Sequence, residues 1–277
     1  MKKNQIQIKS DGGLPISLSI YYRECESEQT LVVILPGMKG FSNWGSFPYI
    51  CERICESGAI VVCIDFSRNG VKNFGDDITQ IELVEGDCPS NQVEEGKKVI
   101  EYLLREKPLY GCHINTSSIF VLGHSLGGAT ALLLAQKTNM LSGIITWSSI
   151  AHFNIWPEKI IENWKKEGRI NMPNERTGQD YYLGKEFLKD VLHISTSGLL
   201  NIVKEMDIPY LIIHGEIDTS VPVDHAKQLF NANKSNNTLK IIPKADHTYG
   251  AKHPFEGTTN ELESAINSTI EWIHKKQ

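Results

Sequence analysis

Short apolar runs of strand length alternate with amphipathic stretches along most of the chain. The apolar runs are rich in Val and Ile, carry few charges, and lie at residues 31–35, 59–65, 118–122, 143–147, 210–214 and 239–242. This alternation predicts an α/β fold, with a largely parallel sheet covered by helices on both faces. Residues 5–10 and 15–24 instead alternate polar and apolar positions, as an antiparallel pair at a sheet edge does. We therefore expect a sheet of about eight strands.

Helical patterns fill the spaces between these runs. We expect helices at 49–57, where Gly58 follows as a C-terminal cap, and at 126–137, which is rich in Ala and Leu. Asn91 and Glu94 resemble a capping box, which predicts that another helix begins at Asn91. The last helix has an apolar stripe formed by Leu262, Ile266, Ile270 and Ile273. That stripe can close over the sheet.

One segment, from about residue 151 to 206, departs from the alternation of strand and helix. Pro157 and Gly168 mark the start and end of a helix within it, and aromatic residues gather at Phe153, Trp156, Trp164, Tyr181, Tyr182 and Phe187. A structureless loop of this length would be unusual. We expect a single domain over residues 1–277, with 151–206 as a small inserted cap. Its aromatic side chains either cover an apolar pocket or form a core of their own.

Composition and charge bear on the binding partners of the protein and on its cellular compartment. The chain has 277 residues, with 28 basic and 33 acidic side chains, and shows no long block of like charges. Neither nucleic acid nor an anionic membrane surface is expected as a partner. The N-terminus lacks the apolar segment of a secretory signal, and the apolar runs are too short to span a bilayer. The six cysteines follow no zinc-finger spacing, so we expect reduced thiols in a cytoplasmic protein.

The segment Gly-His-Ser-Leu-Gly at 123–127 has the pattern G-x-S-x-G, with a strand before it and a helix-forming run after it. In this context the serine occupies a strained turn between strand and helix, and the glycines leave room for backbone that a Cβ would block. Ser125 is the candidate nucleophile. The N–H of Leu126, at the positive end of the helix, is a candidate donor to an oxyanion.

A serine hydroxyl needs a general base, and the expected chain order is Ser, acid, His. Asp218 lies just beyond the strand at 210–214, and His247 lies in the loop after the strand at 239–242. Because parallel strands end at the same edge of the sheet, His247 can reach Ser125 and Asp218 can reach His247. His247 would take the proton of Ser125, and Asp218 would orient the imidazole.

Other residues compete for these roles. The alternatives for the acid are Glu216, Asp224 and Asp246, and the alternative for the base is His253. His124 is expected to point away from the nucleophile, and His214 is expected to be a packed imidazole. No spaced set of His, Asp and Glu indicates a metal site, and the triad chemistry needs no cofactor.

The second oxyanion donor is expected in the loop Leu-Pro-Gly-Met-Lys-Gly-Phe at 35–41, where two glycines let the backbone turn its amides. The N–H of Met38 is the first candidate, and that of Lys39 is the alternative. For a substrate pocket, the candidates are Trp147 at a strand end and Tyr181 and Tyr182 in the insert.

Three motifs in this order resemble the α/β-hydrolase superfamily: 123–128 around Ser125, 214–222 around Asp218 and 245–249 around His247. Together with the loop at 36–41, they are most similar to its dienelactone-hydrolase-like and feruloyl-esterase-like branch. True dienelactone hydrolases carry a cysteine nucleophile where this chain has Ser125, and family members often have His-Gly where it has Pro36 and Gly37. The resemblance implies an α/β-hydrolase fold and a serine hydrolase.

We expect a carboxylesterase that cleaves small-molecule esters of small acyl or aryl acids through an acyl-enzyme. The same triad would serve a peptidase of the prolyl-oligopeptidase-like type or a thioesterase. A protein of this fold that binds a ligand without turnover is the alternative outside the enzymes, and the intact order of Ser, Asp and His argues against it.

Overall fold

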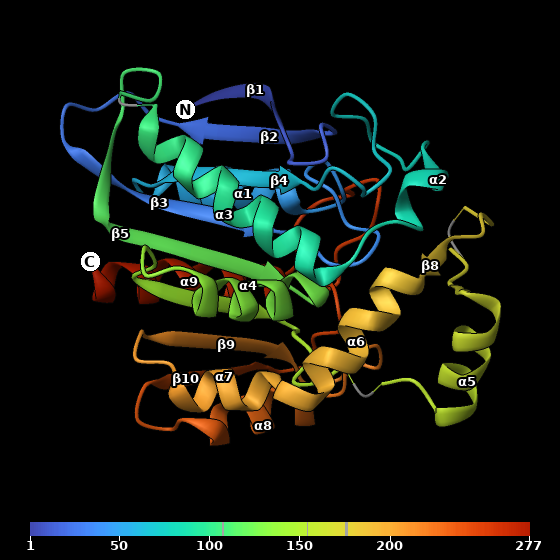
Figure 1. Cartoon of the computed structure of the whole chain (residues 1–277). Coiled ribbons are helices and arrows are strands. Elements are labelled where there is room, and N and C mark those ends of the chain that lie inside the picture. The colour runs from blue at the N-terminus through green and yellow to red at the C-terminus, as the bar shows by residue number, and fades with distance from the viewer. Residues whose placement is uncertain (107, 154, 175–176) are drawn as a thin grey trace.

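The computed structural model describes residues 1–106, 108–153, 155–174 and 177–277. An eight-stranded sheet of order β1-β2-β4-β3-β5-β6-β9-β10 runs through its centre (Figure 1). The strands are β1 (Lys2–Lys9), β2 (Pro15–Tyr22), β3 (Glu28–Leu35), β4 (Ile60–Asp65), β5 (His113–His124), β6 (Gly143–Trp147), β9 (Tyr210–Gly215) and β10 (Asn237–Ile242). In sheet order, every neighbouring pair from β4 to β10 is parallel. The pairs β1–β2 and β2–β4 are antiparallel. The predicted α/β architecture is confirmed.

Alternate side chains of the central strands enter different hydrophobic cores. In β3, Leu31, Val33 and Leu35 belong to one core, whereas Val32 and Ile34 belong to the other. Successive side chains of a strand point to opposite faces, so a strand covered on both sides must be apolar at every position. This requirement explains the unbroken apolar runs of the sequence.

Helices cover both faces of the sheet. On one face lie α3 (Pro89–Arg105), α4 (Leu126–Lys137), α7 (Leu199–Glu205) and α8 (Asp224–Ala232). The other face is covered by α1 (Phe47–Glu56) and α9 (Asn260–Lys276), which lie behind the sheet in Figure 1. A short helix, α2 (Ile81–Val84), interrupts the long connection between β4 and α3. Within the described residues, none of the helices has both the length and the apolar character needed to cross a bilayer.

The start of α3 differs from the prediction. The helix begins at Pro89, with Cys88 as the preceding cap residue, so Asn91 lies inside its first turn. The side-chain amide of Asn91 donates to the carbonyl of Gly86, 3.4 Å away. Proline is favoured at the first helical position because its missing N–H has no partner there. The capping box proposed at Asn91 and Glu94 is therefore wrong.

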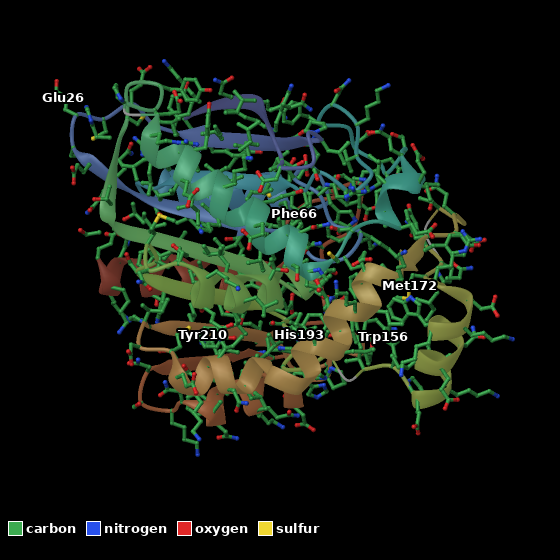
Figure 2. The ribbon with its side chains drawn as sticks, in the orientation of Figure 1. Glu26, Phe66, Trp156, Met172, His193 and Tyr210 are labelled. Carbon is green, nitrogen blue, oxygen red and sulfur yellow. The ribbon has the colours of Figure 1, made fainter. Side chains whose placement is uncertain are left out.

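Between β6 and β9 the chain forms α5 (Glu158–Glu167), β7 (Arg169–Asn171), β8 (Tyr182–Gly184), α6 (Lys185–Ser197) and α7. Figure 1 shows α5 and β8 standing away from the sheet, with α6 in between. Trp164 and Phe187 stack at 6.0 Å, and Trp156, labelled in Figure 2, meets both rings edge-on. These three aromatic residues form a core within the insert. Because α7 packs against α4 and α8, the end of the 151–206 segment is part of the layer on the sheet.

Candidate active site

Ser125 occupies a sharp turn between the end of β5 and the start of α4. Its backbone angles are φ 55° and ψ −119°, a region that non-glycine residues rarely adopt. Its N–H donates to the carbonyl of Trp147 at 2.9 Å, and its own carbonyl accepts from the amide of Gly128 at 3.0 Å. Neighbouring backbone thus holds a strained conformation in place, as is common at functional sites.

The glycines around Ser125 are required by close contacts of the backbone. A Cβ on Gly123 would lie 2.1 Å from the carbonyl oxygen of Gly127, and one on Gly127 would lie 2.1 Å from the carbonyl oxygen of Leu35. A Cβ on Gly37 would lie 2.9 Å from the Cβ of Ser125. The loop after β3 therefore packs directly against the turn that carries Ser125.

Asp218 and His247 are joined by a hydrogen bond. His247 Nδ1 lies 2.8 Å from Oδ2 of Asp218, and the other carboxylate oxygen accepts from the amides of Ser220 and Val221 at 2.9 and 2.8 Å. Burial raises the pKa of Asp218, but hydrogen bonds from His214 and His247 outweigh it and hold the pKa below its usual range. The carboxylate is therefore ionised at neutral pH.

His214 is fully buried beside the same carboxylate. Its Nε2 lies 2.7 Å from the carbonyl oxygen of Val221 and 3.3 Å from Oδ2 of Asp218. A proton on Nε2 satisfies both oxygens. The residue is a packed imidazole, as expected, and it also contacts the candidate acid.

The competing candidates have structural partners. Oδ1 of Asp246 accepts from two main-chain amides of its own turn, Glu216 accepts from the amide of Lys244, and Asp224 pairs with a lysine on the surface. His253 accepts from a main-chain amide at Nδ1, 2.9 Å away, and donates from Nε2 to a main-chain carbonyl, 2.7 Å away. Both nitrogens of His253 are thus occupied, so it has no free site for a proton from Ser125.

His124 contacts the loop that carries His247. Its Nε2 lies 3.0 Å from the carbonyl oxygen of His247, and the two ring centroids are 4.9 Å apart. It also lines the same cavity as Ser125, so the expectation that it points away from the site is wrong. The side chain leaves the carboxyl end of β5, where the His247 loop passes over the sheet. Burial, with a smaller contribution from His247, lowers the pKa of His124 to about 3.

This buried imidazole should add an acid-sensitive contribution to the stability of the fold. Burial lowers the pKa of His124 to about 3 and that of His225 to about 4, so below pH 6.5 the unfolded chain binds protons at these residues that the folded chain does not. The two imidazoles should therefore lower the free energy of unfolding as pH drops from 6.5 towards 4, whereas the buried carboxyls of Asp65, Asp87 and Glu95, whose pKa values are raised, act in the opposite direction. Urea unfolding of the wild type and of His124→Gln at pH 7, 5.5 and 4.5 isolates the contribution of His124, and the variant should gain stability relative to the wild type as the pH falls. The same pH dependence in both proteins would contradict the prediction.

Ser125 and His247 both line a cavity of about 240 Å³ at the carboxyl edge of the sheet. Most of its wall is apolar or aromatic, and the other lining residues are Gly37, Met38, Lys39, Gly40, Phe41, Trp44, Phe47, Ile78, His124, Asn174 and Thr248. Ile78 and Asn174 were not predicted, because they lie in connections without hydrophobic periodicity. The cavity provides an apolar site next to the candidate nucleophile.

Trp147, Tyr181 and Tyr182 lie outside the wall of this cavity. The indole N–H of Trp147 donates to Thr269 at 3.1 Å. Trp147 borders a separate, smaller pocket of about 20 Å³. The ring of Tyr181 is buried in the insert, and its hydroxyl donates to Gln179 at 2.8 Å. Tyr182 lies beneath the guanidinium of Arg169 at 4.2 Å.

The two candidate oxyanion donors, Met38 and Leu126, come from the two segments that pack against each other: the loop after β3 and the turn that carries Ser125. Leu126 is the first residue of α4, and Met38 lies in a turn closed by a hydrogen bond of 2.9 Å from the amide of Gly40 to the carbonyl of Gly37. Over the residues that the structure describes, neither the amide of Met38 nor that of Leu126 donates to a protein acceptor. Both N–H groups are therefore available to a ligand.

Two curated relatives share part of this sequence. The "Uncharacterized peptidase YuxL" of Bacillus subtilis (strain 168) is 24% identical over 228 residues, 81% of this chain and 32% of the relative. Cutinase 1 of Thermobifida cellulosilytica is 23% identical over 216 residues, 77% of this chain and 58% of the relative. The chain thus spans about a third of the first relative's length and somewhat more than half of the second's.

Solved structures confirm the fold, and a family model identifies the family. Est1E from Butyrivibrio proteoclasticus with bound ferulic acid superimposes with a TM-score of 0.71 at 18% identity, over 98% of each chain. The sequence model of the BD-FAE family matches residues 45–232, more than half of the chain. The chain therefore belongs to the BD-FAE family of α/β hydrolases.

Proposed function

We propose that the protein is a serine hydrolase of the carboxylesterase type that is acylated at Ser125. The observation that carries the proposal is the hydrogen bond of 2.8 Å between His247 Nδ1 and Asp218, with His247 and Ser125 on one cavity. A carboxylate at Nδ1 keeps the proton on that nitrogen. Nε2 of His247 is then the unprotonated nitrogen that a general base requires.

The reaction follows from these positions. His247 Nε2 takes the proton of Ser125 while Oγ bonds to the ester carbonyl carbon, and the tetrahedral oxyanion receives the N–H groups of Leu126 and Met38. His247 then gives the proton to the leaving alcohol as the C–O bond breaks. In the second half, water gives its proton to His247 and attacks the acyl carbon, and Ser125 Oγ leaves with that proton.

The hydrogen bond between Ser125 and His247 has still to form in the described structure. Among the described residues, no hydrogen bond joins the hydroxyl of Ser125 to Nε2 of His247. A hydroxyl rotates freely about its χ1 bond, and such contacts often shorten only when substrate binds. We therefore place the formation of this hydrogen bond in the substrate complex.

The wall of the cavity supports small apolar acyl or aryl esters as substrates. Phe41, Trp44 and Phe47 present aromatic surface, and about 240 Å³ is enough for one small ring with its substituents. The ferulic acid bound to Est1E and the cutinases among the relatives support an ester of this class.

Labelling with a fluorophosphonate probe tests the proposal directly. We expect covalent labelling at Ser125, mapped by mass spectrometry, and competition by p-nitrophenyl acetate. Heat-denatured protein is the control, because labelling there would show reactivity unrelated to the site. The absence of labelling at Ser125 in the folded protein would contradict the proposal.

Initial rates on four substrate types separate the enzyme classes. A short aryl ester and a methyl hydroxycinnamate should be cleaved faster than an acyl thioester or an aminoacyl anilide. Faster cleavage of the anilide would favour the peptidase alternative, which the name of the Bacillus relative keeps relevant.

A further inference from the structure

The oxyanion loop, defined here as residues 36–41, has a cavity on each side. In front lies the cavity of about 240 Å³ with Ser125, and behind lies one of about 30 Å³ that reaches Leu126, Asp87 and Phe187. Gly37, Met38, Lys39 and Gly40 line both. Side-chain packing on its own holds a segment poorly where voids adjoin it, because the contacts on those sides are missing. The packing of Gly37 on the Ser125 turn and the hydrogen bond from Gly40 to Gly37 fix one end of the loop, so a restraint on its other end would also affect the position of the Met38 amide.

Lys39 supplies such a restraint from within the loop. Its backbone has φ 62°, a left-handed conformation in which a side chain with a Cβ is strained. Its ammonium donates to the carbonyl oxygen of Pro173 at 2.7 Å and lies 5.5 Å from the centre of the Tyr181 ring. The side chain thus crosses from the oxyanion loop to the insert.

The insert offers a fixed anchor at this point. Tyr181 is buried, and its carbonyl accepts from the amide of Met172 at 2.6 Å. Tyr181 also packs in one hydrophobic cluster with Phe41 of the oxyanion loop and with Ile78 and Val84 of the connection after β4. The ammonium itself is solvent-exposed, and its hydrogen bond to Pro173 and its cation–π contact with the buried ring act together to hold it against the insert.

We propose that Lys39 is a positioning residue that ties the oxyanion loop to the insert and thereby sets the place of the Met38 amide. The effect of this contact on catalysis rests on the proposed function, because the contact matters for turnover only if the Met38 amide stabilises the oxyanion. The tie itself is a property of the fold. The ammonium of Lys39 contacts the insert, so the side chain would act on the oxyanion site through the backbone that it holds.

Lys39→Met tests the proposal, because it keeps the length of the side chain and removes the ammonium. With p-nitrophenyl acetate we expect kcat to fall about tenfold while KM changes less than about twofold, since a misplaced donor weakens only the transition state. The dissociation constant of phenylboronic acid, which forms a tetrahedral adduct on a serine nucleophile, should rise by a similar factor. Lys39→Arg keeps the positive charge and should recover most of the loss.

Arg169→Met is the matched control. Arg169 also links the insert to the connection after β4, through Glu85 at 3.4 Å, but it does not line the catalytic cavity. We expect this variant to keep kcat within about twofold, because the donor stays in place. An equal loss of kcat in both variants would mean a general loosening of the insert and would overturn the proposal.

Hydrogen–deuterium exchange measures how firmly the oxyanion loop is held, and it does not depend on catalysis. Lys39→Met should speed exchange in peptides covering residues 36–41, whereas Arg169→Met should not. Unchanged exchange in Lys39→Met overturns the proposal even if the wild type is an active esterase. A wild type that neither hydrolyses esters nor reacts at Ser125 would refute the proposed function, while faster exchange in Lys39→Met would still establish the tie.

Discussion

His247→Ala is expected to lower kcat for p-nitrophenyl acetate by about four to six orders of magnitude, as loss of the base does in other serine hydrolases. The neighbouring imidazoles cannot take its place. His124 uses Nε2 for the carbonyl of His247, His253 uses both nitrogens for main-chain groups, and His214 is buried beneath Asp218. Without a base, the hydroxyl of Ser125 remains protonated and is a poor nucleophile.

Single-turnover acylation of the wild type and the variant measures this loss. His113→Ala is a suitable control, because His113 is exposed at the start of β5, the opposite end of the strand from Ser125. The double variant Ser125→Ala with His247→Ala should be no slower than either single variant, since the two residues act as one unit. Retention of more than about a tenth of wild-type kcat in His247→Ala would exclude it as the base.

Asp218→Asn is expected to lower kcat about ten-thousandfold with little change in the fold. The amides of Ser220 and Val221 need an acceptor, so the carbonyl oxygen of the new side chain takes the place of Oδ1. The new NH₂ group then faces His247 Nδ1, which can only accept from it. The proton of the imidazole moves to Nε2, and that nitrogen can no longer accept the proton of Ser125.

The measurement compares kcat and the urea midpoint of Asp218→Asn with those of Glu216→Gln. Glu216 lies two residues earlier, and its carboxylate accepts a main-chain hydrogen bond from Lys244. We expect Glu216→Gln to keep kcat within about threefold. If Glu216→Gln lost more activity than Asp218→Asn, the acid would be Glu216.

The sheet was predictable from sequence because its strands are buried on both faces and are therefore apolar without interruption. Sequence did not indicate the helices α6, α7 and α8 or the strands β7 and β8. The strands β7 and β8 have three residues each and form a two-stranded sheet of their own. The first part of β5 was missed as well, because residues such as His113 pair with β3 through tertiary contact, without an apolar run.

The candidate triad was predictable because each member follows a strand, and parallel strands end at one edge. Ser125 follows β5, Asp218 follows β9 and His247 follows β10. The walls of the cavity were not predictable from sequence, because Ile78 and Asn174 line it from long connections whose course depends on packing. For the same reason the contact between His124 and the main chain of His247 leaves no trace in the local sequence.

The two edge strands of the sheet affect how folded molecules associate with one another. β1 and β10 are the outermost strands, and each has one side free of a neighbouring strand in the described sheet. β1 carries Lys2, Lys3 and Lys9, and β10 carries Lys240. Like charges along an unpaired strand repel a second copy and discourage it from adding on through main-chain hydrogen bonds. We therefore expect these lysines to disfavour growth into cross-β aggregates.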